Sequence, residues 1–391
     1  MTLRYAPTEK SILPRLEEKN FTQQEISKNP VQYIEESLIQ TISAEMEKLK
    51  GKIAISLSSG VDSTLVLSIL RKLYPDTEID SISVKFADSI DESAAAAKIA
   101  EEFHTNHHVL FVENFLEELP KAISIVKLPF WDLHWYHVAK KVKTLCKVFF
   151  SGDGGDELFG GSTFRYDKYL NITRKDSTSI EKVKNYLNCH ERDWVPDQDV
   201  LFSNDLKFTW NEIYKLLEPY FDNTLPLLSQ VFLADFNGKL LYNMLPLYSN
   251  IHDYFQIKNI TPLLSEQLIS FATHLPIDQK YNHQNKTGKI LLLKLLEKYK
   301  TSHLISRKKQ GFSVDTLNLW NSYGKQLCEY YLDNARIVND NIINSEWIQK
   351  HIKKPSIDVR YVNKFLGLLA LEIWYRLHIT HEMDENERLT V

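Results

Sequence analysis

The residues best suited to chemistry in the first part of the chain are Ser58-Ser59-Gly60-Val61-Asp62-Ser63. They follow an apolar run at 53–57 and precede apolar residues at helical spacing, which predicts a turn between a buried strand and a helix. Small side chains let backbone N–H groups approach an anion, and a helix N-terminus adds about half a positive charge. We therefore expect a phosphate cradle in which Asp62 serves as a ligand for Mg²⁺. The spacing is not that of a Walker loop, which excludes an ordinary kinase or GTPase, and a simple serine–glycine helix cap is the alternative.

A second turn, rich in glycine and acids, follows a later apolar strand. The run Ser151-Gly-Asp-Gly-Gly-Asp-Glu-Leu-Phe-Gly-Gly161 holds five of the chain's 12 glycines and three acids. Glycines let the backbone lie close to a ligand. Acidic side chains can lie beside a polyanionic ligand if a metal ion binds between them. Because the carboxyl ends of parallel strands meet at one edge of a sheet, the two turns are predicted to share one nucleotide.

Alternating strands and helices must position these turns. Strands are expected at 53–57, 79–86, 108–112 and 148–150, and helices at 31–49, 61–70, 94–103, 115–126, 134–145, 287–299 and 365–377. This alternation predicts an α/β fold with a doubly wound parallel sheet. Residues 1–30 are interpreted as an N-terminal extension and 31–391 as one domain, with a nucleotide-binding core at about 50–165 and an additional C-terminal helical layer at about 166–391.

Composition narrows the class of protein. The 391 residues are 43% hydrophobic with a formal charge of −4, which gives no global field for nucleic acid or an anionic membrane. Cys146, Cys189 and Cys328 are scattered without metal-ligand spacing, which indicates a reducing compartment. No secretory signal is recognisable, and no run approaches the roughly 18 apolar residues of a membrane span. We expect a soluble cytoplasmic protein with neither a nucleic-acid nor a membrane partner.

The two turns resemble those of known ATP-using enzymes. The first is similar to the SGGxDS loop of N-type ATP pyrophosphatases, with Ser59 in place of the first glycine. The second resembles the signature of the synthetase domain of asparagine synthetases. The likeness covers about residues 31–320 and includes Asp91-Glu92-Ser93, His107-His108 and Arg307-Lys-Lys-Gln-Gly-Phe-Ser313. It implies the adenine nucleotide alpha-hydrolase-like (PP-loop) fold, ATP as a substrate, Mg²⁺, and adenylation of the aspartate side chain before ammonia displaces AMP.

The resemblance also implies roles for single residues. Asp62 and Asp156 match the family's Mg²⁺ ligands, with helix N-cap carboxylates as the alternative. Asp153 matches a group that assists deprotonation of the incoming amine, with a turn aspartate as the alternative. Lys309 matches a lysine that steadies pyrophosphate and the acyl transfer, with a solvated basic loop as the alternative. The other implied contacts with the nucleotide are Leu57 and Val84 for adenine or ribose, and Ser58, Ser59, Gly60, Ser63, Ser151, Gly152 and Lys289 for the rest of the nucleotide and its phosphates.

Two departures from the family pattern leave the substrate open. Lys258, Ile260 and Ser265 stand where the family has glutamate, arginine and aspartate, so charges that could shape the acceptor pocket are replaced. The chain opens Met1-Thr2-Leu3, whereas a family glutaminase domain starts with a nucleophilic cysteine after the initiator methionine. Nitrogen is therefore expected from free ammonia, another amine or a separate glutaminase subunit.

The pattern predicts an ATP-dependent carbon–nitrogen ligase, with asparagine as the leading product. One alternative is a biosynthetic tailoring ligase of the same fold, similar to β-lactam synthetases or lasso-peptide cyclases, that joins another acid and amine. A non-catalytic nucleotide-binding protein is the other. The acid, the nitrogen donor and the oligomeric state, including a homo-oligomer, stay open.

Overall fold

The strand that carries the first turn, β1 (Ile53–Ser56), lies in the middle of a five-stranded parallel sheet. The computed structural model describes residues 2–8, 10–24, 29–49, 51–87, 91, 93–306 and 314–390. The other strands of the sheet are β2 (Ile79–Phe86), β3 (Asn106–Val112), β4 (Val148–Phe150) and β5 (Lys258–Ile260), in the order β3-β2-β1-β4-β5. All four residues of β1 are buried, as expected for an apolar strand covered on both faces.

The sheet separates two hydrophobic cores. Ile55 of β1 belongs to the first core, whereas its neighbour Ala54 belongs to the second. In β4, Phe150 belongs to the first core and Phe149 to the second. Successive side chains of a strand lie on opposite faces, so each core occupies one face of the sheet. Helices cover both faces, which confirms the predicted doubly wound α/β class.

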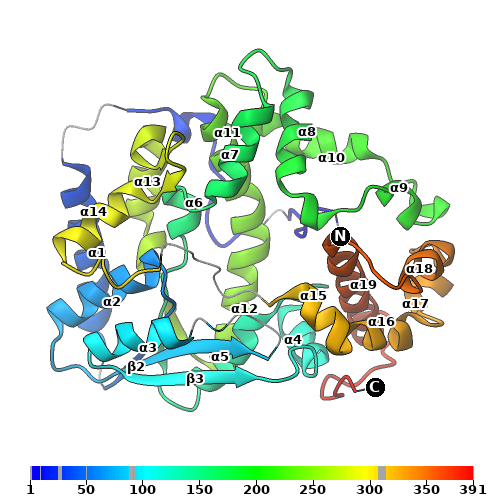
Figure 1. Cartoon of the computed structure of the whole chain (residues 1–391), viewed down its shortest axis with the longest axis horizontal. Coiled ribbons are helices and arrows are strands. Elements are labelled where there is room, and N and C mark those ends of the chain that lie inside the picture. The colour runs from blue at the N-terminus through cyan, green and yellow to red at the C-terminus, as the bar shows by residue number, and fades with distance from the viewer. Residues whose placement is uncertain are drawn as a thin grey trace.

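The helices divide between these cores. The first core includes residues of α1 (Pro30–Met46), α2 (Val61–Leu73), α3 (Ser93–Glu102), α13 (Glu266–His274) and α14 (Ile290–Lys298), and the second includes residues of α4 (Leu119–Val126), α5 (His134–Val142), α12 (Leu245–Phe255) and α19 (Val359–His378). In Figure 1 the helices α1, α2 and α3 lie with β2 and β3 on the left, and α15 to α19 gather on the right.

The remaining helices connect and extend these layers. They are α6 (Gly155–Phe159), α7 (Thr163–Ile172), α8 (Ser179–Cys189), α9 (Gln198–Leu201), α10 (Trp210–Leu217), α11 (Leu227–Asp235), α15 (Thr316–Leu319), α16 (Lys325–Leu332), α17 (Arg336–Asn339) and α18 (Ser345–Ile352). Two π-helical stretches, η5 (Phe236–Met244) and η8 (Trp320–Gly324), and the short 3₁₀ turn η2 (Glu191–Asp193) also occur. Among the described residues, none of the helices has both the length and the apolar character needed to cross a bilayer.

Several element bounds differ from the sequence prediction, and two of the differences concern elements beside the two turns. The helix expected over 287–299 begins later, because Thr287–Gly288 forms the strand β7, which pairs with β6 (Tyr281–Asn282), and Lys289 has a left-handed φ of 55° before α14. A side chain at Gly288 would clash, since its Cβ would lie 1.9 Å from the carbonyl oxygen of Gly160. The strand β5 was not predicted, because three residues beginning with lysine give no apolar strand pattern.

The N-terminal segment lies against the helical part of the chain. The Asn237 side chain accepts a hydrogen bond from the backbone N–H of Leu16 at 2.9 Å and donates to its carbonyl at 2.7 Å. Arg15 donates to the hydroxyl of Tyr220 at 2.6 Å. These contacts tie residues predicted as an extension to η5 and the turn that follows α10.

Candidate active site

The two turns singled out in the sequence pack directly against each other. Their strands, β1 and β4, are neighbours in the sheet. A Cβ on Gly152 would lie 2.6 Å from the backbone nitrogen of Ser63, and one on Gly155 would lie 2.2 Å from Oδ1 of Asp62. Both distances are shorter than any side chain tolerates, so glycine at these positions lets the second turn reach the first.

Lys289 joins the two turns through its ammonium group. Its Nζ lies 2.5 Å from Oδ2 of Asp62 and also pairs with Oδ1 of Asp156. Burial disfavours the ammonium charge, but the two carboxylates outweigh burial and hold the pKa of Lys289 above its ordinary value. Gly161 provides the necessary space, since a Cβ there would lie 2.5 Å from Cε of Lys289. The two predicted metal ligands and this lysine thus form one charged cluster.

This cluster suits a magnesium ion that arrives with a nucleotide. Asp62 and Asp156 both contact the same ammonium group, so their carboxylates point toward one position. A single cation at that position can be bound by both. Within the part of the chain that is described, three or more His, Cys, Asp or Glu side chains do not gather into a metal-binding group. Magnesium commonly takes one or two carboxylates and completes its octahedron with water and substrate phosphates. Two aspartates beside a turn that is predicted to bind phosphate therefore fit Mg²⁺.

Hydrogen bonds order the first turn. Ser63 Oγ donates to the carbonyl of Ser58 at 3.1 Å, and the N–H groups of Ser58 and Gly60 are bonded to Ser63 Oγ and Ser58 Oγ, both at 3.2 Å. Gly60 is the residue before α2, so the turn ends at the positive end of that helix. Ser59 is buried, and its carbonyl accepts from the N–H of Ser306 at 2.9 Å. The turn therefore keeps one shape with its serines at the helix start.

A cavity of about 260 Å³ lies beside both turns. Its lining residues are Ser56, Ser58, Asp62, Ser63, His134, Trp135, Gly152, Asp153, Gly154, Asp156, Glu157, Met244 and Tyr248. We use "aromatic wall" for His134, Trp135, Met244 and Tyr248, which come from α5, the end of η5 and α12. The rings of Trp135 and Tyr248 lie 5.1 Å apart, edge to face. The cavity is thus lined by polar residues of the two turns and by the largely aromatic residues of the wall.

Two further acids of the second turn line this cavity. Asp153 is oriented by Ser151, whose buried hydroxyl donates to Oδ2 at 2.7 Å. The backbone N–H of Ser151 donates to the carbonyl of Ile260 at 3.0 Å, so β5 supports the base of the turn. Burial and then repulsion from Asp156 raise the pKa of Glu157 to about 7. The cavity therefore holds acids in unlike environments.

The predicted site residues that the structure describes divide into three groups. Those that line the cavity are Ser58, Asp62, Ser63, Gly152, Asp153 and Asp156. Lys289 contacts two of these residues, and Ser59, Gly60 and Ser151 belong to the same turns but do not line the cavity. Leu57 is fully buried in the first core, and Val84 is half-buried against the second core, so neither lines the cavity. Lys309 lies outside the described residues.

Several cavity residues escaped the sequence analysis. Glu157 directly follows Asp156 in the glycine-rich turn, so its position was a signal that could have been used. His134 and Trp135 belong to an unusually aromatic run at 130–137. Met244 and Tyr248 have no such signal, because the packing of η5 and α12 brings them to the cavity.

Comparison with known proteins places these features in a family. A family model described as asparagine synthase matches residues 34–376. The asparagine synthetase (glutamine-hydrolyzing) 1 of Bacillus subtilis strain 168 is 24% identical over 363 residues, covering 83% of this chain and 56% of that protein. A putative asparagine synthetase (glutamine-hydrolyzing) 2 of Methanocaldococcus jannaschii is 34% identical over 136 residues, covering 34% of this chain and 25% of that protein. The chain spans about half the length of the first relative.

Solved structures give more distant similarities. The U34-tRNA thiolase NcsA from Methanococcus maripaludis aligns with 14% identity and a TM-score of 0.29, covering 75% of this chain and 88% of that chain. The NMN synthetase from Francisella tularensis aligns with 12% identity and a TM-score of 0.25, covering 60% and 99%.

Proposed function

The chain belongs to the asparagine synthase family, and on this premise we propose that it is an ATP-dependent ligase that forms an amide. A carboxylate oxygen of the acid attacks the α-phosphorus of ATP, and the bond to pyrophosphate breaks. A nitrogen lone pair then attacks the acyl carbon, and AMP leaves. The observation that carries this proposal is the close contact of the two turns, with Asp62 and Asp156 on one ammonium group.

The turns supply what the first step requires. Attack of one anion on another is opposed by charge, so the departing pyrophosphate must be neutralised. Asp62 and Asp156 would hold Mg²⁺, which would neutralise pyrophosphate oxygens when bound. Ser58 and Ser63 would donate to phosphate oxygens from the start of α2. Lys289 would pair with pyrophosphate, and we retain the same role for Lys309.

The second step requires a proton acceptor for the attacking nitrogen. Asp153 lines the cavity, and the hydrogen bond from Ser151 fixes one of its oxygens. The second oxygen would accept a proton from the nitrogen as the C–N bond forms. Free ammonia, another amine or a separate glutaminase subunit would provide this nitrogen.

The identity of the acid divides the proposal into two candidates. Aspartate with ammonia is the leading pair because of the family. The aromatic wall favours a second candidate, a tailoring ligase for an acid with a larger apolar or aromatic body, which would pack against Trp135 and Tyr248. The described lining residues include four acids and no lysine or arginine, so a second carboxylate on the substrate would meet unfavourable charges there.

Pyrophosphate release from ATP and Mg²⁺ tests both candidates. The acids are aspartate and a panel of larger acids, each with ammonium, glutamine or no nitrogen donor. Release with aspartate and ammonium supports the leading pair, and release with a larger acid alone supports the tailoring ligase. Asp62→Asn should abolish release, whereas Asp167→Asn, which removes a surface ion pair with Lys286, should not. ATP binding without release for any acid would refute the ligase and identify a nucleotide-binding protein.

A further inference from the structure

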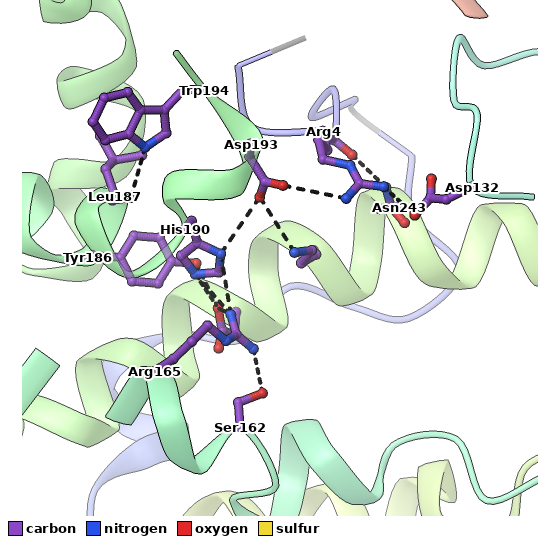
Figure 2. A network of polar contacts seen from close by, with 12 residues as sticks. Arg4, Asp132, Ser162, Arg165, Tyr186, Leu187, His190, Asp193, Trp194 and Asn243 are labelled. Atoms are coloured by element: carbon purple, nitrogen blue, oxygen red, sulfur yellow. Dashed lines mark hydrogen bonds and ion pairs between the residues drawn. The ribbon is translucent and has the colours of Figure 1, made fainter. Parts of the chain in front are cut away.

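Residues 2–5 lie within a buried polar network that the proposed chemistry does not use. The Arg4 guanidinium forms an ion pair with Asp132 and lies 3.5 Å from Oδ1 of Asp193, as Figure 2 shows. Arg4 also has a left-handed φ of 56°, which costs free energy in a residue other than glycine. Such a conformation persists where the surrounding contacts determine it, and it occurs often at functional sites.

Arg4 contacts both supports of the aromatic wall. Its side chain pairs with Asp132, two residues before His134 at the start of α5. Its backbone carbonyl accepts a hydrogen bond from Nδ2 of Asn243 at 2.6 Å, and the next residue is Met244, the end of η5. Figure 2 shows Arg4 with Asp193 on one side and with Asp132 and Asn243 on the other. One residue therefore links two elements that are distant in sequence and that both line the cavity.

The charges that face Arg4 fix its position. Asp193 is 3.6 Å from the ammonium of Lys239 and 3.8 Å from Nδ1 of His190, and its carbonyl accepts from Lys364 at 2.9 Å. Through Asp193, the second end of the Arg4 guanidinium is held at η2, against which α19 also packs. The carboxylate of Asp193 thus pairs with both Arg4 and Lys239, and rotation of Arg4 away from Asp132 would break an ordered arrangement.

The neighbours of Arg4 are also held in place. The hydroxyl of Thr2 accepts from Nε2 of Gln198 at 2.8 Å, and both residues are buried. The hydroxyl of Tyr5 lies so close to Gly238 of η5 that a Cβ there would be 2.6 Å away. The segment is therefore seated on each side of Arg4, and η5 meets it at Gly238 as well as at Asn243.

We propose that Arg4 is a positioning residue that sets the distance between the α5 side and the η5 side of the aromatic wall, and so determines which acid fits. This inference rests on the proposed function for the identity of the ligand. Arg4 forms its hydrogen bonds and ion pairs with Asp132, Asp193 and Asn243, which lie outside the two turns, so nucleotide binding should not depend on it. Loss of the guanidinium would let Asp132 and Asn243 move independently and would loosen the wall.

The kinetic test compares Arg4→Met with Arg4→Lys and with the control Arg15→Met. Arg15 also ties the N-terminal segment to the helical part, through Tyr220, but does not contact the wall. We expect Arg4→Met to raise the KM for the acid about tenfold and leave the KM for ATP within twofold, with partial rescue by Arg4→Lys. Arg15→Met should change neither constant. Equal changes in both KM values, or no change in the KM for the acid, would overturn the inference.

A spectroscopic test does not depend on turnover. The full chain is labelled with 5-fluorotryptophan, and the ¹⁹F resonance of Trp135 is assigned with Trp135→Phe. Arg4→Met should shift or broaden this resonance, whereas Arg15→Met should leave it in place. If Arg4→Met does not fold, Asp132→Asn, which keeps the size of the partner, takes its place. An unmoved resonance would refute bracing of the wall, and a moved resonance without any acid-dependent turnover would refute the ligase alone.

Discussion

Replacement of Lys289 by methionine probes the charged cluster that joins the two turns. Methionine keeps most of the apolar stem and removes the ammonium, which leaves the Asp62 and Asp156 carboxylates facing each other. The side chain of Asp62 is 11% exposed and that of Asp156 is 39% exposed. Removal of one partner of a buried ion pair costs roughly 3–5 kcal/mol, and partial exposure of Asp156 reduces this to about 2–3 kcal/mol.

The expected decrease in the free energy of unfolding can be converted into a shift of the thermal midpoint. Unfolding entropy of about 2.1 cal/mol/K per residue gives about 0.8 kcal/mol/K for the 391 residues of the chain. The thermal midpoint of Lys289→Met should therefore fall by about 3 °C if the chain unfolds cooperatively. Differential scanning calorimetry measures this shift without nucleotide.

Magnesium distinguishes the charge effect from simple loss of packing. In Lys289→Met, Mg²⁺ alone can bind between the two carboxylates. It should reverse at least half of the decrease in thermal midpoint that the substitution causes. In the unaltered protein, Mg²⁺ must compete with the ammonium, so the same concentration should produce a smaller rise. Lys286→Met is the matched control, because Lys286 is 63% exposed and pairs with Asp167 at the surface. Equal thermal midpoints for the unaltered protein, Lys289→Met and Lys286→Met would refute this reasoning. An equal rise of the three midpoints with Mg²⁺ would refute it as well.

Three other predictions address separate contacts. Gly161→Ala should abolish pyrophosphate release, because its Cβ would lie 1.9 Å from Oδ1 of Asp156; an unchanged rate would contradict this. Ser151→Ala should slow amide formation about tenfold, or about 1.4 kcal/mol, while ATP–pyrophosphate exchange continues, because the hydrogen bond that orients Asp153 is lost; parallel loss of both activities would count against the role of Asp153. Burial lowers the pKa of His252 to about 4 from 6.5. Between these pH values His252 binds a proton in the unfolded chain but not in the folded chain. Stability therefore falls as the pH drops from 6.5 towards 4. His252→Phe should flatten that part of a plot of thermal midpoint against pH, and an unchanged slope would show that His252 is not responsible.

The sequence was informative where local pattern determines structure. The strand β2 has the predicted bounds, and its residues Ile82, Val84 and Phe86 alternate with polar residues at the period of a strand. The turn residues Asp62 and Asp156 were correctly expected to lie together, since parallel strands end at one edge of the sheet. Their roles in catalysis remain predictions.

Tertiary contacts determine what the sequence did not reveal. The strand β5 exists because Lys258 to Ile260 lie beside β4, and isolated residues of this type have little strand preference. The aromatic wall depends on α5 and α12 packing side by side, and no spacing in the chain links Trp135 to Tyr248. Lys289 was expected inside a helix, but the close approach of Gly288 to Gly160 moves the helix start beyond it.

The late position of β5 along the chain has a consequence for biosynthesis. On the ribosome, β4 is made long before its partner at 258–260, and its outer backbone groups lack that partner in the meantime. At 5–20 residues per second the interval lasts roughly 5 to 20 s. Because an open strand edge can pair with other chains, we expect the nascent protein to need protection by a chaperone during this interval. Lys289 emerges later still, so the charged cluster that it forms with Asp62 and Asp156 is complete only after most of the polypeptide has been translated.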